Sequence, residues 1–146
     1  MYTAIIPARS GSKRILNKNI KKFLNKPIIY YSIKAAIKTK IFKRIIVSTD
    51  SKKIQLISIK AGASCPFLRP KNLSGDKIGT APVINHAINE LDIKDKYICC
   101  IYPTAPMIKF QDIKNALKLI KKLKTESCYS ITKFGFPIQR ALSLKK

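Results

Sequence analysis

Acidic residues are scarce in this sequence. The 146 residues include 7 aspartates and glutamates against 30 lysines and arginines, which gives a formal net charge of +23. Such a surplus is typical of proteins that bind an anion, for example nucleic acid, a membrane surface or a phosphorylated substrate. Only five of the basic residues are arginines, however, and the lysines are spread along the whole chain. We therefore attribute most of the charge to a compositional bias, and we do not expect nucleic acid to be the partner.

Long apolar runs are missing as well. No stretch approaches the roughly 18 uninterrupted apolar residues that a membrane-spanning helix needs. The apolar run over 4–6 is short and no basic segment precedes it, so we predict no signal peptide. We expect a cytoplasmic protein without membrane insertion. Its hydrophobic content of 46% and its length are sufficient for the core of one domain.

Cysteine and histidine, the usual ligands of zinc, are few and poorly spaced for a metal site. None of the four cysteines belongs to a CxxC pair, and Cys99 and Cys100 are adjacent on a predicted strand, where neighbours point to opposite faces. We predict that Cys65, Cys99, Cys100 and Cys128 are reduced thiols of the core. The single histidine, His86, has no cysteine or histidine at ligand spacing, so we interpret it as a structural or surface residue.

Short apolar runs alternate with amphipathic segments along the chain. We predict strands over 2–7, 44–48, 97–102 and 128–133, a short extended piece over 64–68, and helices over 27–38, 51–61, 80–91 and 111–124. Pro27 suits a first helical turn, Gly62 a helix end, and Thr80 a helix cap. This alternation predicts an α/β fold of three αβα layers around a mostly parallel, Rossmann-like sheet. Because an apolar segment begins just before Lys146, we expect residues 1–146 to form a single domain that is the N-terminal part of a longer one.

Loops that follow the predicted strands carry most of the polar chemistry, and ligands of open α/β sheets bind at this end of the strands. In the first loop Gly11 allows a tight turn, and it is surrounded by cations and hydrogen-bonding groups, namely Arg9, Lys13, Arg14, Lys18, Ser10, Ser12 and Asn19. This loop matches neither the Walker A pattern nor GxGxxG. Its length and composition favour a phosphate-binding loop over an ordinary basic connection.

The other three loops admit two interpretations each. In 48–51, Asp50 or Ser51 suits the cap of the following helix, which we favour over a catalytic role. Arg69 precedes a proline, so its backbone is held extended and its guanidinium could clamp a base or a phosphate. Thr80 could act as a ligand hydroxyl as well as a cap. The two prolines of 102–106 make either a rigid rim of a site or a rigid connection.

Four motifs in fixed order carry a resemblance to a known family. They are AIIPARSGSKRILNKN, STDS, the run FLRP–LSGD–GT, and YPTAP. Together they resemble the acylneuraminate cytidylyltransferases, which activate nonulosonic acids such as sialic acid with CTP. Tyr102 stands where typical sialic acid activators of the family have glutamine, and FPIQRAL over 136–142 looks like the pseudaminic acid cytidylyltransferases. The resemblance therefore favours pseudaminic acid as the sugar.

The resemblance implies a nucleotide-diphospho-sugar transferase type of fold and a set of site residues. The implied nucleotide-binding residues are Arg9, Gly11, Ser12, Lys13, Lys18, Asn19, Arg69 and Thr80. Arg9 and Lys18 would also be catalytic by holding phosphate charge, and Tyr102 and Gln139 would face the sugar.

Further expectations concern the metal, the oligomer and the alternative functions. The family uses Mg²⁺, and its metal-binding aspartates would lie beyond the C-terminal end of this chain, so no metal ligand is assigned here. The full-length protein is expected to be a homodimer. An inactive or partial nucleotide-binding module is the alternative to an active enzyme, and a basic nucleic-acid-binding protein is less favoured.

Overall fold

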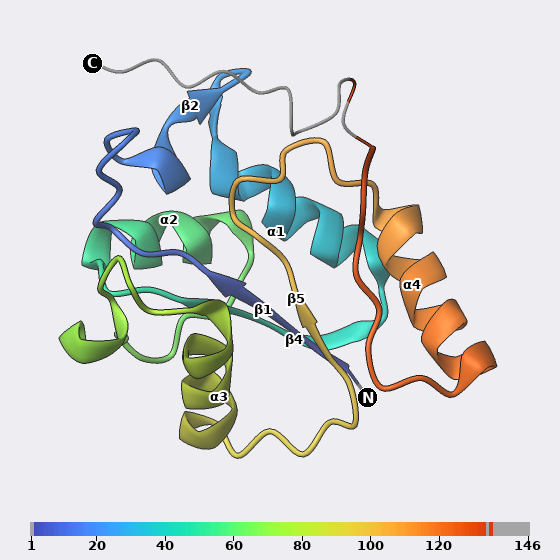
Figure 1. Cartoon of the computed structure of the whole chain (residues 1–146). Coiled ribbons are helices and arrows are strands. Elements are labelled where there is room, and N and C mark those ends of the chain that lie inside the picture. Colours follow the sequence, from blue (N-terminus) through green and yellow to red (C-terminus); the bar gives the residue numbers. More distant parts are fainter. Residues whose placement is uncertain (1, 134, 136–146) are drawn as a thin grey trace. The chain divides into compact units, whose positions relative to one another are not determined.

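The computed structural model describes residues 2–133 and residue 135, and it contains two compact units, Met1–Lys114 and Asn115–Lys146. The strands are β1 (Tyr2–Pro7), β2 (Lys22–Phe23), β3 (Lys26–Pro27), β4 (Phe42–Ser48) and β5 (Ile98–Cys100) (Figure 1). The α-helices are α1 (Ile28–Thr39), α2 (Lys52–Ala61), α3 (Thr80–Glu90) and α4 (Phe110–Leu123), and short 3-10 turns cover Lys18–Ile20 and Lys71–Leu73. None of the helices in this described part is long and apolar enough to cross a membrane.

A parallel sheet of three strands forms the centre of the first unit. Its order is β4-β1-β5, and β1 pairs in parallel with both neighbours. The segment predicted as extended over 64–68 runs beside β4, and within the described part of the chain it makes two isolated parallel bridges, Ile46 with Ser64 and Thr49 with Leu68. The predicted parallel α/β sheet is thus confirmed.

Helices cover both faces of this sheet, as Figure 1 shows. Because successive residues of a strand point to opposite faces, Ala4 and Ile6 of β1 pack on one side in a core cluster with Ile33 of α1. Ile5 points to the other side and packs with Ala87 of α3. All five side chains are buried. The predicted three-layer αβα arrangement is therefore present.

The ends of the helices follow mostly from local sequence signals. Ser51 caps α2 by accepting a hydrogen bond from the backbone N–H of Ile54 at 3.4 Å, and Gly62 ends that helix in a left-handed conformation with φ 100. Pro27 lies at the N-cap of α1, one residue before the first turn. The predicted cap at Thr80 is wrong, because Gly79 is the N-cap and Thr80 is already the first residue of α3.

Two other predictions differ from the structure. The predicted strand over 128–133 is wrong: the segment has no strand partner among the described residues, and its Tyr129 and Ile131 side chains are exposed. The interpretation of all four cysteines as core thiols holds fully only for Cys65, since Cys100 is exposed. His86 does have a structural contact, because its ring packs edge-on against that of Phe67 at a centroid distance of 5.2 Å.

Candidate nucleotide-binding site

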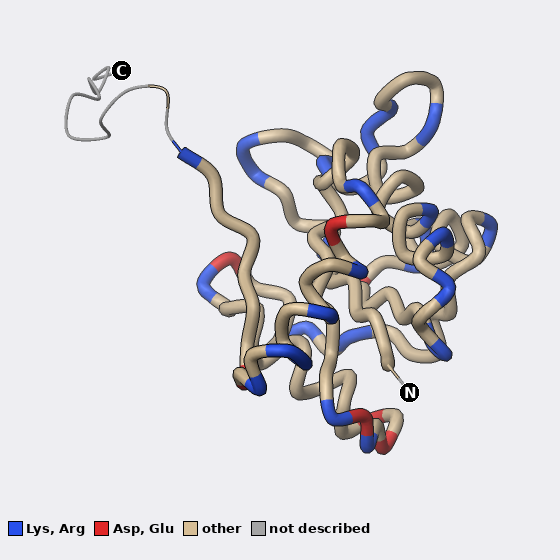
Figure 2. The backbone as a smooth tube through the Cα atoms, turned by 90° about the vertical axis from the view of Figure 1, so that its right-hand side faces the viewer, with Lys and Arg blue, Asp and Glu red and all other residues tan. Residues whose placement is uncertain are grey.

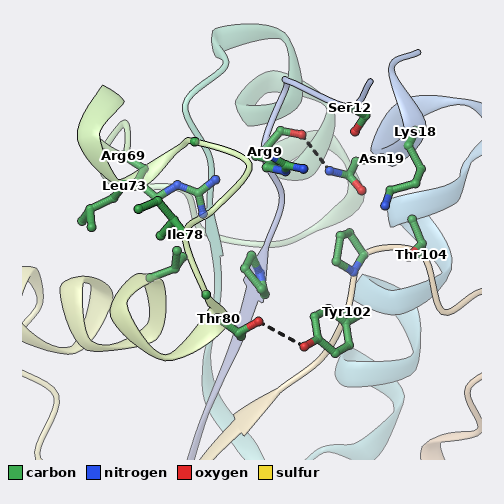
Figure 3. Close-up of a pocket in the computed structure, with 15 residues that line it drawn as sticks. Arg9, Ser12, Lys18, Asn19, Arg69, Leu73, Ile78, Thr80, Tyr102 and Thr104 are labelled. Carbon is green, nitrogen blue, oxygen red and sulfur yellow. Dashed lines mark hydrogen bonds between the residues drawn. The ribbon is translucent and has the colours of Figure 1, made fainter. Parts of the chain in front are cut away.

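A cavity of about 160 Å³ opens at the carboxyl ends of β1 and β5 (Figure 3). The structure brings most of the predicted site residues into its lining, namely Arg9, Ser12, Lys18, Asn19, Arg69, Thr80 and Tyr102. Gly11 and Lys13 belong to the same loop but do not line the cavity, and Gln139 lies outside the described residues. Residues far apart in the sequence therefore meet where the parallel sheet predicts a ligand site.

The conformation of the first loop does not depend on its glycine. The backbone N–H of Ser12 donates to the carbonyl of Ser10 at 2.8 Å, so the predicted tight turn is present at Gly11. The backbone of Gly11 is not left-handed and a Cβ atom built on it meets nothing within 4 Å, so the turn does not require glycine. Further along the loop, Asn17 adopts a left-handed conformation with φ 53, directly before the 3-10 turn that carries Lys18 and Asn19. Gly11 is exposed, which leaves room for a ligand to approach its backbone.

Asn19 brings a buried acceptor to the cavity. Its side chain is only 4% exposed, and its amide group donates to the backbone carbonyl of Arg9 at 2.8 Å. Its Oδ1 atom is buried and has no hydrogen-bond partner among the described residues. An unpaired buried acceptor costs about 1–3 kcal/mol. A ligand that donates a hydrogen bond here would remove that cost.

Arg69 places a buried cation in the cavity wall. It is 4% exposed, its backbone N–H donates to the carbonyl of Thr49 at 2.7 Å, and its Nε atom donates to Ser74 Oγ at 3.3 Å. Burial lowers the pKa of this guanidinium, the charge of Asp50 opposes that effect, and the charge of Arg9 adds to it. A buried cation of this kind favours an anionic or acceptor-rich ligand.

Tyr102 connects the two sides of the cavity. Its backbone carbonyl accepts a hydrogen bond from the buried Ser32 Oγ of α1 at 2.9 Å. Its hydroxyl lies within hydrogen-bond distance of the Oγ1 atom of Thr80, at 3.1 Å (Figure 3). The Thr80 hydroxyl therefore bonds across the cavity instead of capping α3. The tyrosine is 58% exposed, so its ring remains accessible to a ligand.

Two carboxylates hold the basic loop, and they are the only acidic residues among the first 89 positions. Asp50 accepts hydrogen bonds from the backbone N–H of Ser10 at 2.8 Å and from its hydroxyl at 2.7 Å. Asp76 forms ion pairs with Arg9 and, at 2.8 Å, with the Nζ atom of Lys13. Hydrogen bonds from Lys13 and then from Arg9 lower the pKa of Asp76.

Sequence reasoning missed the roles of both carboxylates. Asp50 was one of two candidate helix caps, and the cap is Ser51. Asp76 lies in the LSGD part of the third loop and was not singled out. Their rarity could have revealed them, because Asp50 and Asp76 are the only acidic residues among the many basic residues of the first 89 positions.

The described residues do not fit a metal site. They contain no group of three or more His, Cys, Asp or Glu side chains that could hold a metal ion. Mg²⁺ prefers carboxylate oxygens together with water and phosphate. The two nearby carboxylates are engaged elsewhere, Asp50 by Ser10 and Asp76 by two cations.

The basic character of the chain is not confined to this site. Figure 2 shows lysine and arginine positions in most segments of the backbone, with few acidic positions between them. What distinguishes the cavity is its set of polar groups, a buried guanidinium, a buried unpaired acceptor and a loop with several cations. This combination suits a small ligand with both phosphate and hydrogen-bonding groups.

Comparisons with known proteins agree with that chemistry. The family model described as "Cytidylyltransferase" matches residues 3–141. The pseudaminic acid cytidylyltransferase of Campylobacter jejuni is 40% identical to this chain. The alignment covers 97% of this chain and 62% of the Campylobacter protein. The N-acylneuraminate cytidylyltransferase of Escherichia coli is 36% identical to this chain. That alignment covers 93% of this chain and 32% of the Escherichia coli protein. The chain therefore matches only part of the length of these relatives.

A solved structure supports the fold. The structure of CMP:2-keto-3-deoxy-manno-octonic acid synthetase in complex with CTP superposes on this chain with a TM-score of 0.72. The superposition covers 83% of this chain and 47% of the synthetase chain. The two sequences are 18% identical, so this likeness concerns the fold alone.

Proposed function

Because this chain belongs to the cytidylyltransferase family, we propose that it is the nucleotide-binding part of an enzyme that uses CTP to activate a nonulosonic acid. The products would be the CMP-sugar and pyrophosphate. The observation that carries the proposal is the cavity itself, which gathers the buried Arg69, the unpaired Asn19 acceptor and the basic loop at one end of the sheet. A nucleoside triphosphate offers the anions and the hydrogen-bond donors that these groups lack.

The residues divide into three roles in this proposal. Arg9, Ser12, Lys13 and Lys18, with the backbone at Gly11, would bind the phosphates. Asn19, Arg69 and Thr80 would contact the cytidine, and Tyr102 and Gln139 would face the sugar. The shared lining of the cavity supports the first two roles for every residue except Gly11 and Lys13, which belong to the same loop but lie outside the lining. The exposed ring of Tyr102 supports the third role.

The proposed reaction joins the anomeric oxygen of the sugar to the α-phosphorus of CTP. The bond from that phosphorus to the β-phosphate oxygen breaks, pyrophosphate leaves with the electron pair, and the hydroxyl proton passes to solvent. Such chemistry depends mainly on positioning and on neutralising charge. Arg9 and Lys18 would therefore act as catalytic residues by stabilising the negative charge that develops on the phosphates.

Pseudaminic acid is the favoured sugar. The relative from Campylobacter jejuni carries that activity in its name, and Tyr102 replaces the glutamine expected in sialic acid activators. We further propose Mg²⁺ as the metal that assists the reaction and a homodimer as the full-length assembly. We also propose a cytoplasmic localisation and a single domain that extends beyond residues 1–146.

A pyrophosphate-release assay on the full-length gene product tests the function. With CTP and Mg²⁺, we expect release with pseudaminic acid and much less with sialic acid or with UTP in place of CTP. Release with sialic acid alone would contradict the choice of sugar. Release with neither sugar, combined with tight DNA binding that weakens steeply with salt, would favour the nucleic-acid alternative instead.

A further inference from the structure

The two carboxylates beside the basic loop bind it in different ways. Among the described residues, Asp50 accepts hydrogen bonds from Ser10 alone, through its backbone N–H and its hydroxyl. Asp50 therefore forms no ion pair with Arg9 or Lys13 of the loop. Asp76 contacts the cations themselves, since its two oxygens pair with Arg9 and Lys13. An anionic ligand of this loop would compete with Asp76 but not with Asp50.

We propose that Asp76 is an exchangeable counter-ion of the phosphate loop, which holds Arg9 and Lys13 in the ligand-free protein and releases them to the incoming phosphate groups. The proposal rests on the proposed function, because it takes nucleotide phosphates and pyrophosphate as the displacing anions. It adds a regulatory role, since a resident carboxylate weakens the binding of substrate and product phosphates alike.

Exposure and charge both favour the exchange. The side chains of Arg9 and Asp76 are 34% and 38% exposed, and that of Lys13 is 84% exposed, so water screens both ion pairs. Asp76 supplies one negative charge, whereas a triphosphate supplies several charges and more acceptor oxygens. The cations therefore gain more from phosphate than they lose from the carboxylate.

The position of Asp76 also fits a competitor rather than a ligand of the nucleotide. Its neighbours Gly75 and Ile78 line the cavity, as does its partner Arg9, but Asp76 itself does not. The carboxylate thus lies at the rim and reaches the guanidinium from outside. Gly75 and Asp76 are exposed, which gives this part of the third loop room to move when the ion pairs break.

Isothermal titration calorimetry on the full-length protein tests the proposal with pyrophosphate and with CTP. We expect Asp76→Asn to bind pyrophosphate about threefold to fivefold more tightly than the wild type at low salt, the range that exposed ion pairs support. The gain should shrink in 0.5 M salt because screening weakens the competing pairs. Asp76→Glu, which keeps the charge, should behave like the wild type.

Asp92→Asn is the matched control. It removes the same charge from an exposed carboxylate that pairs with Lys94, a residue outside the cavity lining. Equal effects of Asp76→Asn and Asp92→Asn, or weaker binding in Asp76→Asn, would overturn the proposal. Pyrophosphate binding that tightens in Asp76→Asn while CTP binds to neither protein would support the counter-ion role and refute the proposed function. If no protein binds either ligand, both proposals fail.

Discussion

Removal of the Asp50 carboxylate should destabilise the protein through the basic loop. In Asp50→Ala, two hydrogen bonds to Ser10 are lost, at 2.8 Å from its backbone N–H and at 2.7 Å from its hydroxyl. Hydrogen bonds to charged groups contribute about 1.5–3 kcal/mol when well shielded. Both bonds here are exposed, so we expect about 1 kcal/mol each and about 2 kcal/mol in total.

Urea unfolding followed by circular dichroism measures this loss. With a typical slope of about 2 kcal/mol per molar urea, the unfolding midpoint should fall by about 1 M in Asp50→Ala. Ser10→Ala removes only the hydroxyl bond, so its shift should be about half as large. Asp92→Ala, which breaks an exposed ion pair with Lys94, should change the midpoint very little.

The comparison among these variants decides whether Asp50 anchors the loop. A midpoint for Asp50→Ala no lower than that for Asp92→Ala would refute the reasoning. A second readout separates the two carboxylates beside the loop. Asp50→Ala should weaken pyrophosphate binding because the loop loses its anchor, whereas Asp76→Asn should strengthen it. The same sign in both variants would show that the two carboxylates share one role.

Three further predictions concern other parts of the chain. Gly62→Ala should lower the free energy of unfolding by about 1–2 kcal/mol, because φ at Gly62 is +100 and the added Cβ would lie 3.0 Å from Ile37 Cδ1. Urea unfolding measures this loss, and an unchanged unfolding midpoint would contradict it. Lys18→Ala should reduce pyrophosphate release in the full-length enzyme far more than Lys122→Ala, which changes a lysine of α4; equal losses would mean that the loop has no special role. Burial raises the pKa of the Cys65 thiol to about 11 from 9.0, so the native state keeps a proton that the unfolded state loses. The free energy of unfolding should therefore fall between pH 9 and 11, and Cys65→Ala should show a smaller fall in urea titrations across that range; equal slopes would contradict this assignment.

Local signals predicted the fold well where they were strong. The strand over 2–7 matches β1, and Gly62 ends α2 as expected. The predicted strand over 97–102 is longer than β5, which covers Ile98–Cys100, although the N–H of Ile101 still donates to the carbonyl of Ile5 at 3.1 Å. The strand over 128–133 was wrong because an apolar, β-branched segment forms a strand only if another strand pairs with it, which its own sequence does not reveal.

The site was predictable in position but not in its internal contacts. Parallel strands bring their carboxyl ends together, so Arg9 and Arg69 were expected to meet. The ion pair of Arg9 with Asp76 joins residues 67 positions apart, and the bond of Ser32 to Tyr102 spans 70 positions. Such contacts depend on loop conformations that composition and periodicity do not specify. The helix cap expected at Thr80 failed for the same reason, since its hydroxyl is directed to a distant tyrosine.

The hydrogen bond between Thr80 and Tyr102 makes two specificities interdependent. In the proposed function, Thr80 serves the choice of nucleotide and Tyr102 the choice of sugar, yet their hydroxyls are 3.1 Å apart. An exchange of Tyr102 for the glutamine of sialic acid activators would remove the phenol that Thr80 meets. Substitutions at these two positions should therefore be epistatic, and an enzyme redesigned for a new sugar would need its nucleotide pocket readjusted together with it.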